Sequence, residues 1–278
     1  MGDPVGKPEQ QVELAWEFRA LAHRHAGWTV FYEVGREHLP LYIDLGLTLS
    51  KLGEEARVPL TTFSLEGSSR RGLRQTCRRL ERANATFEIV PREAVPGLLP
   101  ELERVSTEWL VSKRTREKGF SLGGFDPDYL KRFRHAVIRR EGRIVAFANL
   151  WETSGREEVS LDLMRHSADA PDDVMEYLFT QLFLRCREEG HRWFNLGMAP
   201  LSGLETRALA PLWQRVGALV YGHGERFYNF RGVRNFKEKF DPVWTPRYIV
   251  SPGGLALPRI LASIAALISD GWRGVVTK

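Results

Sequence analysis

The sequence predicts an α/β protein made of two related lobes, because one order of helix and strand occurs in each half. In the first half, apolar residues recur at helical spacing over residues 9–26, and Gly27 ends that helix before a β-rich aromatic run at 28–34. In the second half, residues 172–189 repeat the amphipathic helix, and Gly190 ends it before another aromatic run. The recurrence of helix, glycine and aromatic strand predicts a duplicated unit.

The segments around these helices predict the remaining elements. Residues 39–47 predict a short helix, and two β-rich stretches follow it at 48–58 and 61–65. Ahead of the second long helix, three apolar runs predict an antiparallel meander, at 136–140, 143–151 and 159–165. A meander followed by a helix and a further strand is the order of the acyl-CoA N-acyltransferase (GNAT) fold. We therefore expect an α/β (α+β) protein with two tandem GNAT-like lobes.

Composition and charge limit the class of protein. A chain of 278 residues with 43% hydrophobic and 27% charged side chains is typical of a folded globular protein. The net charge of +5 favours polyanionic partners such as RNA or anionic lipid, without deciding between them. Cys77 and Cys186 lie outside any CxxC pattern, which favours a reducing compartment over a disulfide framework. No apolar run reaches the roughly 18 residues that cross a bilayer, and no secretory signal is visible.

Signatures of metal, hydrolase and CoA sites are missing. The sequence contains no HExxH, CxxC or GxSxG pattern, so we expect no metal and no cofactor. Acetyl-CoA enzymes of the GNAT fold hold the pyrophosphate on a glycine-rich loop that opens the long helix. Here the matching residues, 166–173, contain no glycine and three acids, which would repel a pyrophosphate. The fold therefore predicts acyl transfer, while this loop argues against CoA as the donor.

The strongest charge feature is an arginine-rich helix in residues 70–82. It holds six arginines against one acid, Glu81: Arg70, Arg71, Arg74, Arg78, Arg79 and Arg82. At helical spacing, four of them share one face: Arg71, Arg74, Arg78 and Arg82. Because arginine makes bidentate contacts to phosphate, we expect this helix to bind the backbone of tRNA or anionic headgroups. The alternative is a solvated helix between the lobes.

Polar residues on two strands and one helix start are the candidate catalytic groups. In a regular strand, residues three apart point to opposite faces, so Asp162 and Arg165 share a site only if the strand bulges or ends near Met164. The alternative is an ion pair that ties the strand to a helix. Asn195 follows an apolar strand and suits substrate positioning or a plain turn. The hydroxyl of Tyr129 can donate to substrate, although packing is an equal alternative.

A basic segment, Arg234-Asn235-Phe236-Lys237-Glu238-Lys239, is the last candidate. Lys237 and Lys239 cannot share one face of a helix, so we expect only one of them to enter a site. The alternative is the start of a surface helix. A lone Gly222-His223-Gly224 is too weak to indicate a nucleotide site.

Together these segments resemble the C-terminal catalytic region of the aminoacyl-phosphatidylglycerol synthases, the multiple peptide resistance factor family. The family's essential Asp-x-x-Arg matches residues 162–165, its Phe-Lys-x-Lys-Phe matches 236–240, and the resemblance covers nearly the whole chain. Further matching segments lie at residues 39–42, 51–56, 117–123 and 195–200. The alanyl type is the most similar, although these residues leave alanine and lysine open as the transferred amino acid.

The resemblance also implies how the chain is divided. Residues 2–6 resemble a motif inside the family's catalytic region, which implies a first lobe that is incomplete at its N-terminus. We expect four parts: a remainder of the first lobe at 1–66, a basic connecting helix at 67–86, a second, catalytic lobe at 87–250, and a C-terminal apolar helix at 251–278. That last helix would lie on the bilayer surface, with Trp272 at the interface, or pack on the fold.

The implied reaction is transesterification from aminoacyl-tRNA to a glycerol hydroxyl of phosphatidylglycerol. It would lower the negative charge of the membrane and give resistance to cationic antimicrobial peptides. Asp162 would orient the attacking hydroxyl or hold the substrate ammonium, and Arg165 would hold the lipid phosphate or steady the oxyanion. Lys237 would serve the phosphate or the leaving group, Asn195 would position the ester, and Tyr129 would donate to substrate. Phosphate contacts would come from Arg70, Arg71, Arg74, Arg78, Arg82, Arg234 and Lys239.

The implied partners are aminoacyl-tRNA, phosphatidylglycerol on an anionic membrane surface, and an N-terminal transmembrane domain in the full-length protein. That protein would work at the cytoplasmic face of a bacterial inner membrane, with this chain as a soluble portion. Three alternatives stay open: a CoA-dependent N-acyltransferase, a tRNA-dependent aminoacyltransferase acting on a cell-wall peptide, and a non-catalytic module that binds RNA or lipid.

Overall fold

The computed structural model of the chain describes residues 1–205, 207, 230–269 and 271. The chain forms two compact units. Unit 1 contains residues 1–57 and 196–264, and unit 2 contains residues 58–195 and 265–278. Trp272 and Gly222-His223-Gly224 lie outside the described residues.

Unit 1 is built around strand β8 (Val243–Ser251), which pairs antiparallel with β1 (Phe31–Val34) and with β2 (Thr48–Pro59). The second pairing runs from Thr48 opposite Ser251 to Arg57 opposite Val243. The helices of this unit are α1 (Pro8–Arg24), α2 (Leu39–Asp44), α8 (Phe230–Glu238) and most of α9 (Ala256–Ile268). One apolar cluster in its core contains Ala15, Phe31, Val34, Tyr42, Leu45 and Val250.

Unit 2 contains the predicted meander. Its strands lie in the order β7-β6-β5-β4-β3; residues 193–195 of β7 belong to this unit and pair parallel to β6, and the other neighbours are antiparallel. The strands are β3 (Ala85–Val90), β4 (His135–Arg140), β5 (Arg143–Glu152), β6 (Glu158–His166) and β7 (Trp193–Pro200). The helices are α3 (Arg71–Arg82), α4 (Val95–Lys113), α5 (Pro127–Leu130) and α6 (Val174–Glu188), after a 3-10 turn at Leu60–Thr62.

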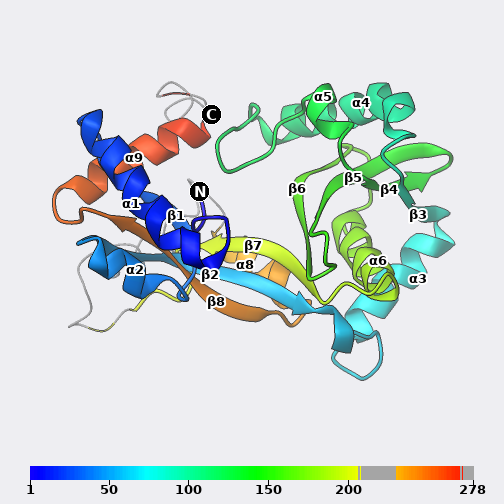
Figure 1. Cartoon of the computed structure of the whole chain (residues 1–278). Helices are drawn as coiled ribbons and strands as arrows, with labels where there is room; N and C mark the ends of the chain where they lie inside the picture. Colours follow the sequence, from blue (N-terminus) through cyan, green and yellow to red (C-terminus); the bar gives the residue numbers. More distant parts are fainter. Residues whose placement is uncertain (206, 208–229, 270, 272–278) are drawn as a thin grey trace. The chain divides into compact units, whose positions relative to one another are not determined.

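Helices cover both faces of the unit 2 sheet, as the ribbon in Figure 1 shows. All of residues 135–138 on β4 are fully buried, although successive side chains of a strand point to opposite faces. On one face, Leu102 and Val105 of α4 pack against Val137 and Phe147. Helix α6 packs on the same strands and also contacts α3. The sheet is therefore held rigidly between two helical layers, which suits it to position side chains at its strand ends.

Most of the predicted elements are present. The predicted helices 9–26 and 172–189 are observed as α1 and α6, and the meander, the helix after it and the parallel strand confirm the GNAT-like α/β fold. The predicted strand at 61–65 is wrong, because Leu60–Thr62 form a 3-10 turn closed by Phe63 N donating to Leu60 O. Among the described helices, none has the length and apolar character that crossing a bilayer requires.

The unit boundaries differ from the expected divisions at residues 66, 86 and 250. Residues 196–264 join the N-terminal unit, because β8 pairs along the whole of residues 48–57. The basic helix α3 belongs to unit 2, where it packs on α6 and β3. The expected C-terminal helix is observed as α9, and it begins in unit 1 and ends in unit 2.

Candidate active site

A bulge in strand β6 decides which of its polar side chains lie together. Ala148 pairs with Met164 and Leu150 pairs with Leu161, so Asn149 alone faces two residues of β6. One extra residue in a strand reverses the alternation of side chains beyond it. The bulge therefore turns Asp162 and Arg165 towards the same side of the sheet. The spacing of the two residues in the sequence requires such a bulge if they are to share a site.

Asn149 holds this bulge in place. Its side chain is fully buried, and its Oδ1 accepts a hydrogen bond of 2.7 Å from the backbone N–H of Leu163. That N–H has lost a ladder partner at the bulge, and a buried donor without an acceptor costs about 1–3 kcal/mol. Asn149 is the one amide in an apolar run from Ile144 to Leu150, which was the signal that sequence reasoning missed.

Asp162 forms a hydrogen-bonded pair with Tyr129. The Tyr129 hydroxyl donates to Asp162 Oδ2 at 2.6 Å and accepts from Trp151 Nε1 at 2.9 Å. Tyr129 comes from α5, where the Asp126 side chain accepts from the N–H groups of Asp128 and Tyr129 and caps the helix. Burial, and then the hydrogen bond to Asp162, raise the pKa of Tyr129 well above its usual 10. The phenol is therefore a stable donor at neutral pH.

Arg165 is the buried cation of this site. It is 5% exposed, and its guanidinium lies 4.2 Å from the ring centre of Trp109 on α4. Arg165 Nη2 donates to Glu117 Oε2 at 2.8 Å, whereas Nη1 is buried without a hydrogen-bond partner among the described residues. Burial lowers the pKa of Arg165, and Glu117 opposes that shift. A buried guanidinium with an unused N–H group is suited to bind an anion.

The segment Glu117–Gly124 contacts both charged groups. Glu117 pairs with Arg165, and Gly123 packs so closely on Asp162 that any larger side chain would overlap the carboxylate. Glycine at this position therefore allows the backbone to approach Asp162. This segment was noted in the sequence only as a resemblance, and neither Glu117 nor Trp109 was predicted there as a site residue.

Asn195 lies elsewhere in unit 2. Its Nδ2 donates to Glu158 Oε1 at 3.0 Å, and Asn195 pairs with Ser160 at the start of the parallel β6–β7 ladder. Its role in positioning the ester remains a prediction.

Lys237 belongs to unit 1, where it is almost fully buried. Its Nζ donates to the carbonyl oxygens of Gly197 and Met198, at 2.9 and 2.8 Å, near the end of β7. Burial lowers the pKa of Lys237 from 10.5 to about 8, while the carboxylates of Glu55 and Glu33 oppose the shift. Burial also raises the pKa of Glu33. A lysine with this pKa can exchange a proton near neutral pH.

The other basic residues of that segment point away from this buried position. Lys239 is exposed, with its Nζ 5.9 Å from the ring centre of Phe236. Of the two lysines that cannot share a face, Lys237 is therefore the inward one. Arg234 donates to Glu54 at 2.6 Å and stacks on Trp244 at 4.2 Å, so its guanidinium is already engaged within unit 1.

The arginine helix α3 presents part of the predicted face to solvent. Arg71, Arg78 and Arg82 are exposed, while the buried side of the helix carries Leu73, Cys77 and Leu80. Arg74 differs from the prediction, because its Nη1 donates to the carbonyls of Leu65 and Gly67 and so holds the preceding loop. Arg70 lies over the ring of Phe63 at 5.3 Å.

The geometry of Asp162, Tyr129 and Arg165 suits acyl transfer to a hydroxyl. Asp162 Oδ2 is occupied by Tyr129, and Oδ1 accepts no hydrogen bond from any described residue, so it is available to a hydroxyl nucleophile. A carboxylate can orient a hydroxyl nucleophile, and a buried guanidinium can stabilise the negative charge that develops on an ester oxygen. The fold defines the chain as a GNAT-like α/β protein.

The chain belongs to the family described as phosphatidylglycerol lysyltransferase, C-terminal, whose model matches residues 1–251. It is 43% identical to the phosphatidylglycerol lysyltransferase of Bacillus subtilis over 278 residues, covering 99% of this chain and 32% of that protein. It is 35% identical to the enzyme of the same name from Staphylococcus aureus, covering 90% of this chain and 30% of that protein. The chain thus spans about a third of the length of these relatives.

A solved structure agrees with this family. The C-terminal domain of a putative lysylphosphatidylglycerol synthetase from Agrobacterium fabrum matches with a TM-score of 0.87 and 43% identity, covering 99% of this chain and 83% of that one. L-PGS from Bacillus licheniformis matches with a TM-score of 0.83 and 40% identity, covering 97% and 82%. These relatives carry the lysyl name where they name an amino acid, so the expected alanyl type is not supported.

We expect the depressed pKa of Lys237 to appear as a pH-dependent stability. Between about pH 8 and 10.5 the unfolded chain binds the extra proton, so the free energy of unfolding rises with pH, by on the order of 3 kcal/mol. Urea unfolding of the wild type and Lys237→Met at pH 7.5, 8.5 and 9.5 measures this rise as a difference between them. Lys239→Met is the matched control, because that lysine is exposed. An equal pH slope in the wild type and Lys237→Met would contradict the assignment.

Proposed function

We propose that this chain is the catalytic part of an enzyme that transfers lysine from lysyl-tRNA to a glycerol hydroxyl of phosphatidylglycerol. The observation that carries the proposal is the Asp162–Tyr129 pair beside the buried, incompletely bonded Arg165, in a member of the phosphatidylglycerol lysyltransferase family. In the full-length protein the reaction would take place at the cytoplasmic face of the membrane. An added lysine would make the lipid less negative and weaken the attraction of cationic peptides.

The reaction balances without ATP, metal or a redox partner. A glycerol hydroxyl attacks the carbonyl carbon of the lysyl ester, and a new C–O bond forms as the bond to the tRNA ribose oxygen breaks. The proton of the attacking hydroxyl passes to the leaving ribose oxygen. Asp162 Oδ1 orients the attacking hydroxyl and takes part in this proton transfer, while Tyr129 holds the carboxylate through Oδ2.

Arg165 supplies positive charge where negative charge is held or develops. Its unused Nη1 binds the lipid phosphate or the oxyanion of the tetrahedral intermediate. Trp109 and Glu117 hold the guanidinium from two sides, so little reorganisation is needed during the reaction. We keep Lys237 as a candidate residue that acts on the leaving group or binds a phosphate, because its lowered pKa suits proton exchange.

The choice of tRNA as donor rests on two features of unit 2. The loop between β6 and α6 carries Asp169, Asp172 and Asp173 where a CoA-binding protein of this fold places glycines. Helix α3 exposes Arg71, Arg78 and Arg82 on a surface suited to phosphate. The choice of lysine rests on the names of the relatives.

The proposal predicts that label from lysyl-tRNA enters lipid. The chain is incubated with radiolabelled lysyl-tRNA and phosphatidylglycerol vesicles, and label is counted in the lipid extract. Alanyl-tRNA, phosphatidylcholine vesicles and a cell-wall peptide precursor serve as parallel arms. We expect label only from lysyl-tRNA into phosphatidylglycerol. Label in the peptide precursor, label from alanyl-tRNA alone, or no label in any arm would contradict the proposal.

Substitutions in the site should remove transfer without unfolding the chain. We expect Asp162→Asn to lower the rate by about 10²–10⁴-fold and Arg165→Lys by about 10²–10³-fold, because each removes charge stabilisation or proton transfer. Asp128→Asn is the matched control, since this exposed carboxylate adjoins Tyr129 in α5 without bonding to it. Circular dichroism and the initial rate of lipid labelling are measured together. Folded Asp162→Asn with near-normal turnover would exclude the assigned role.

A further inference from the structure

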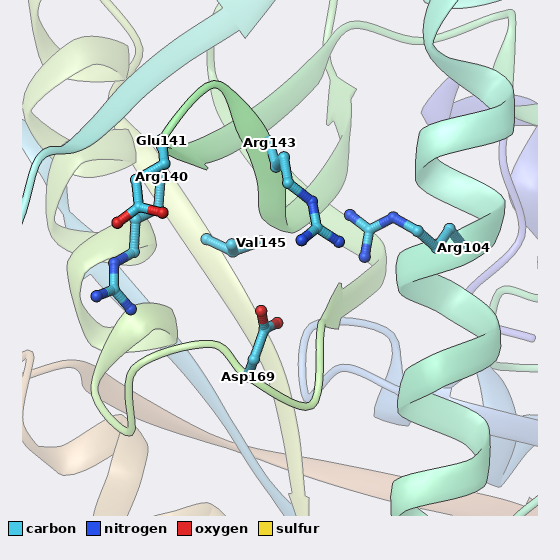
Figure 2. A pocket seen from close by; sticks show the side chains of 6 residues that line it. All are labelled: Arg104, Arg140, Glu141, Arg143, Val145 and Asp169. Carbon is cyan, nitrogen blue, oxygen red and sulfur yellow. The ribbon is translucent and has the colours of Figure 1, made fainter.

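A second arginine cluster lies in unit 2, at the turn between β4 and β5. It lines a hollow of about 130 Å³ formed by Arg104, Arg140, Glu141, Arg143, Val145 and Asp169. Figure 2 shows the guanidinium groups of Arg104 and Arg143 pointing towards each other, with the Asp169 carboxylate below them. Like charges that face one another at short range are stabilised by an anion between them.

The bonding of these arginines leaves donors available. Arg104 is held in place, because it donates to Glu108 at 2.8 Å and to the Ile144 carbonyl at 2.7 Å. The side chains of Arg140 and Arg143 donate no hydrogen bond to any described residue, and Nε of Arg140 is buried. Two carboxylates also line the hollow, and Glu108 neutralises Arg104, so the available donors are those of Arg140 and Arg143.

The arginines of the hollow act on the nearby carboxylate of Asp169. Asp169 is exposed, and a hydrogen bond from Ser167 lowers its pKa, with Arg143 and Arg104 adding to the shift. These guanidinium groups thus already stabilise one negative oxygen group. A phosphate, with more charge and more acceptor atoms than a carboxylate, would be held more firmly.

The hollow adjoins the exposed face of α3. Strand β3 begins at Ala85, which pairs with Arg140, and α3 ends at Arg82, three residues earlier. A second hollow, of about 280 Å³, is lined by Gln75, Arg78, Arg79 and Arg82. We call the exposed or half-buried arginines of the two hollows that pair with no carboxylate of the described residues the arginine strip: Arg78, Arg82, Arg140 and Arg143.

The loop between β6 and α6 joins the two hollows. Asp169 lines the first, and Asp173 pairs with Arg79 in the second. Four residues of chain span at most about 14 Å, so the two hollows lie within reach of one extended polyanion. Arg79 is left out of the arginine strip because Asp173 already neutralises it.

The surface of the arginine strip favours RNA over membrane. None of the exposed large hydrophobic side chains in the described part of the chain lies in residues 66–92, 139–146 or 167–173. Surfaces that dock on a bilayer add exposed apolar side chains that insert among the lipids. A polar surface with spaced guanidinium groups is instead suited to the phosphates of a nucleic-acid backbone.

We propose that the arginine strip binds successive phosphates of an RNA backbone and that the hollow at the β4–β5 turn holds one of them. This inference rests on the proposed function, in which the RNA is the aminoacyl-tRNA donor. The contacts fix the orientation of the RNA on unit 2 and carry no base specificity.

Binding of uncharged tRNA tests the proposal. Dissociation constants are measured by fluorescence anisotropy from 50 to 200 mM salt for the wild type, Arg140→Gln/Arg143→Gln and Arg140→Lys/Arg143→Lys. We expect the glutamine pair to weaken binding about tenfold and to lower the slope of log K against log salt by about 1–2, because each lost phosphate contact removes about 0.7–0.9. The lysine pair should keep most of the slope.

The matched control is Arg92→Gln/Arg192→Gln, which removes two exposed arginines from other parts of unit 2. We expect its affinity to stay within about twofold of the wild type, since Arg92 follows the opposite end of β3 from Ala85. Equal weakening by the two glutamine pairs would overturn the proposal. The proposal would also be overturned if the glutamine pair lost binding to phosphatidylglycerol vesicles but kept binding to tRNA.

The same variants separate this inference from the proposed function. If the wild type transfers lysine and Arg140→Gln/Arg143→Gln shows an unchanged KM for tRNA and unchanged binding, the arginine strip is overturned and the function stands. If the wild type transfers nothing while the glutamine pair still loses tRNA binding, the function fails and the arginine strip stands. Asp162→Asn should bind tRNA as the wild type does.

Discussion

The candidate site depends on one hydrogen bond, from the backbone N–H of Leu163 to Oδ1 of Asn149. This bond stabilises an extra residue in β6, and the extra residue turns Asp162 and Arg165 towards the same side of the sheet. Without the bulge, the two side chains would point to opposite faces, one of which is filled by α4 and the other by α6. The buried amide of Asn149 in an apolar strand is thus explained by the bulge, which orients the two candidate catalytic side chains.

Unit 2 uses arginine in two different ways. Arg165 is nearly fully buried, with Trp109 and Glu117 against it, which suits it to bind a single anion in a fixed geometry. The arginine strip is solvated and spread over two hollows, which suits a flexible chain of phosphates whose binding falls with salt. This division allows the donor to be held at one surface while the reacting groups are held at another part of the same rigid sheet.

Local patterns in the sequence predicted the long helices, the meander and the exposed arginines of α3, because these depend on the periodicity of nearby residues. The unit boundaries were not predictable in this way, since they follow from the pairing of residues 48–57 with 243–251. The sequence showed that Asp162 and Arg165 need a bulge in order to share a site. It could not predict that bulge, because the bulge depends on Asn149 in another strand. Glu117 and Trp109 were missed for the same reason, as both reach Arg165 from distant segments.

The most direct test is Asn149→Leu, which keeps the branching of the side chain at Cγ and removes the acceptor of Leu163 N–H. We measure the hydrogen exchange of the Leu163 amide and the rate of lysyl transfer in the same preparation. The account predicts faster exchange at Leu163 and a rate lowered about 10²-fold in a folded protein, because misplacing catalytic groups by about 1 Å has an effect of that size. A variant with a freely exchanging Leu163 amide and wild-type turnover would contradict the claim that the bulge builds the site.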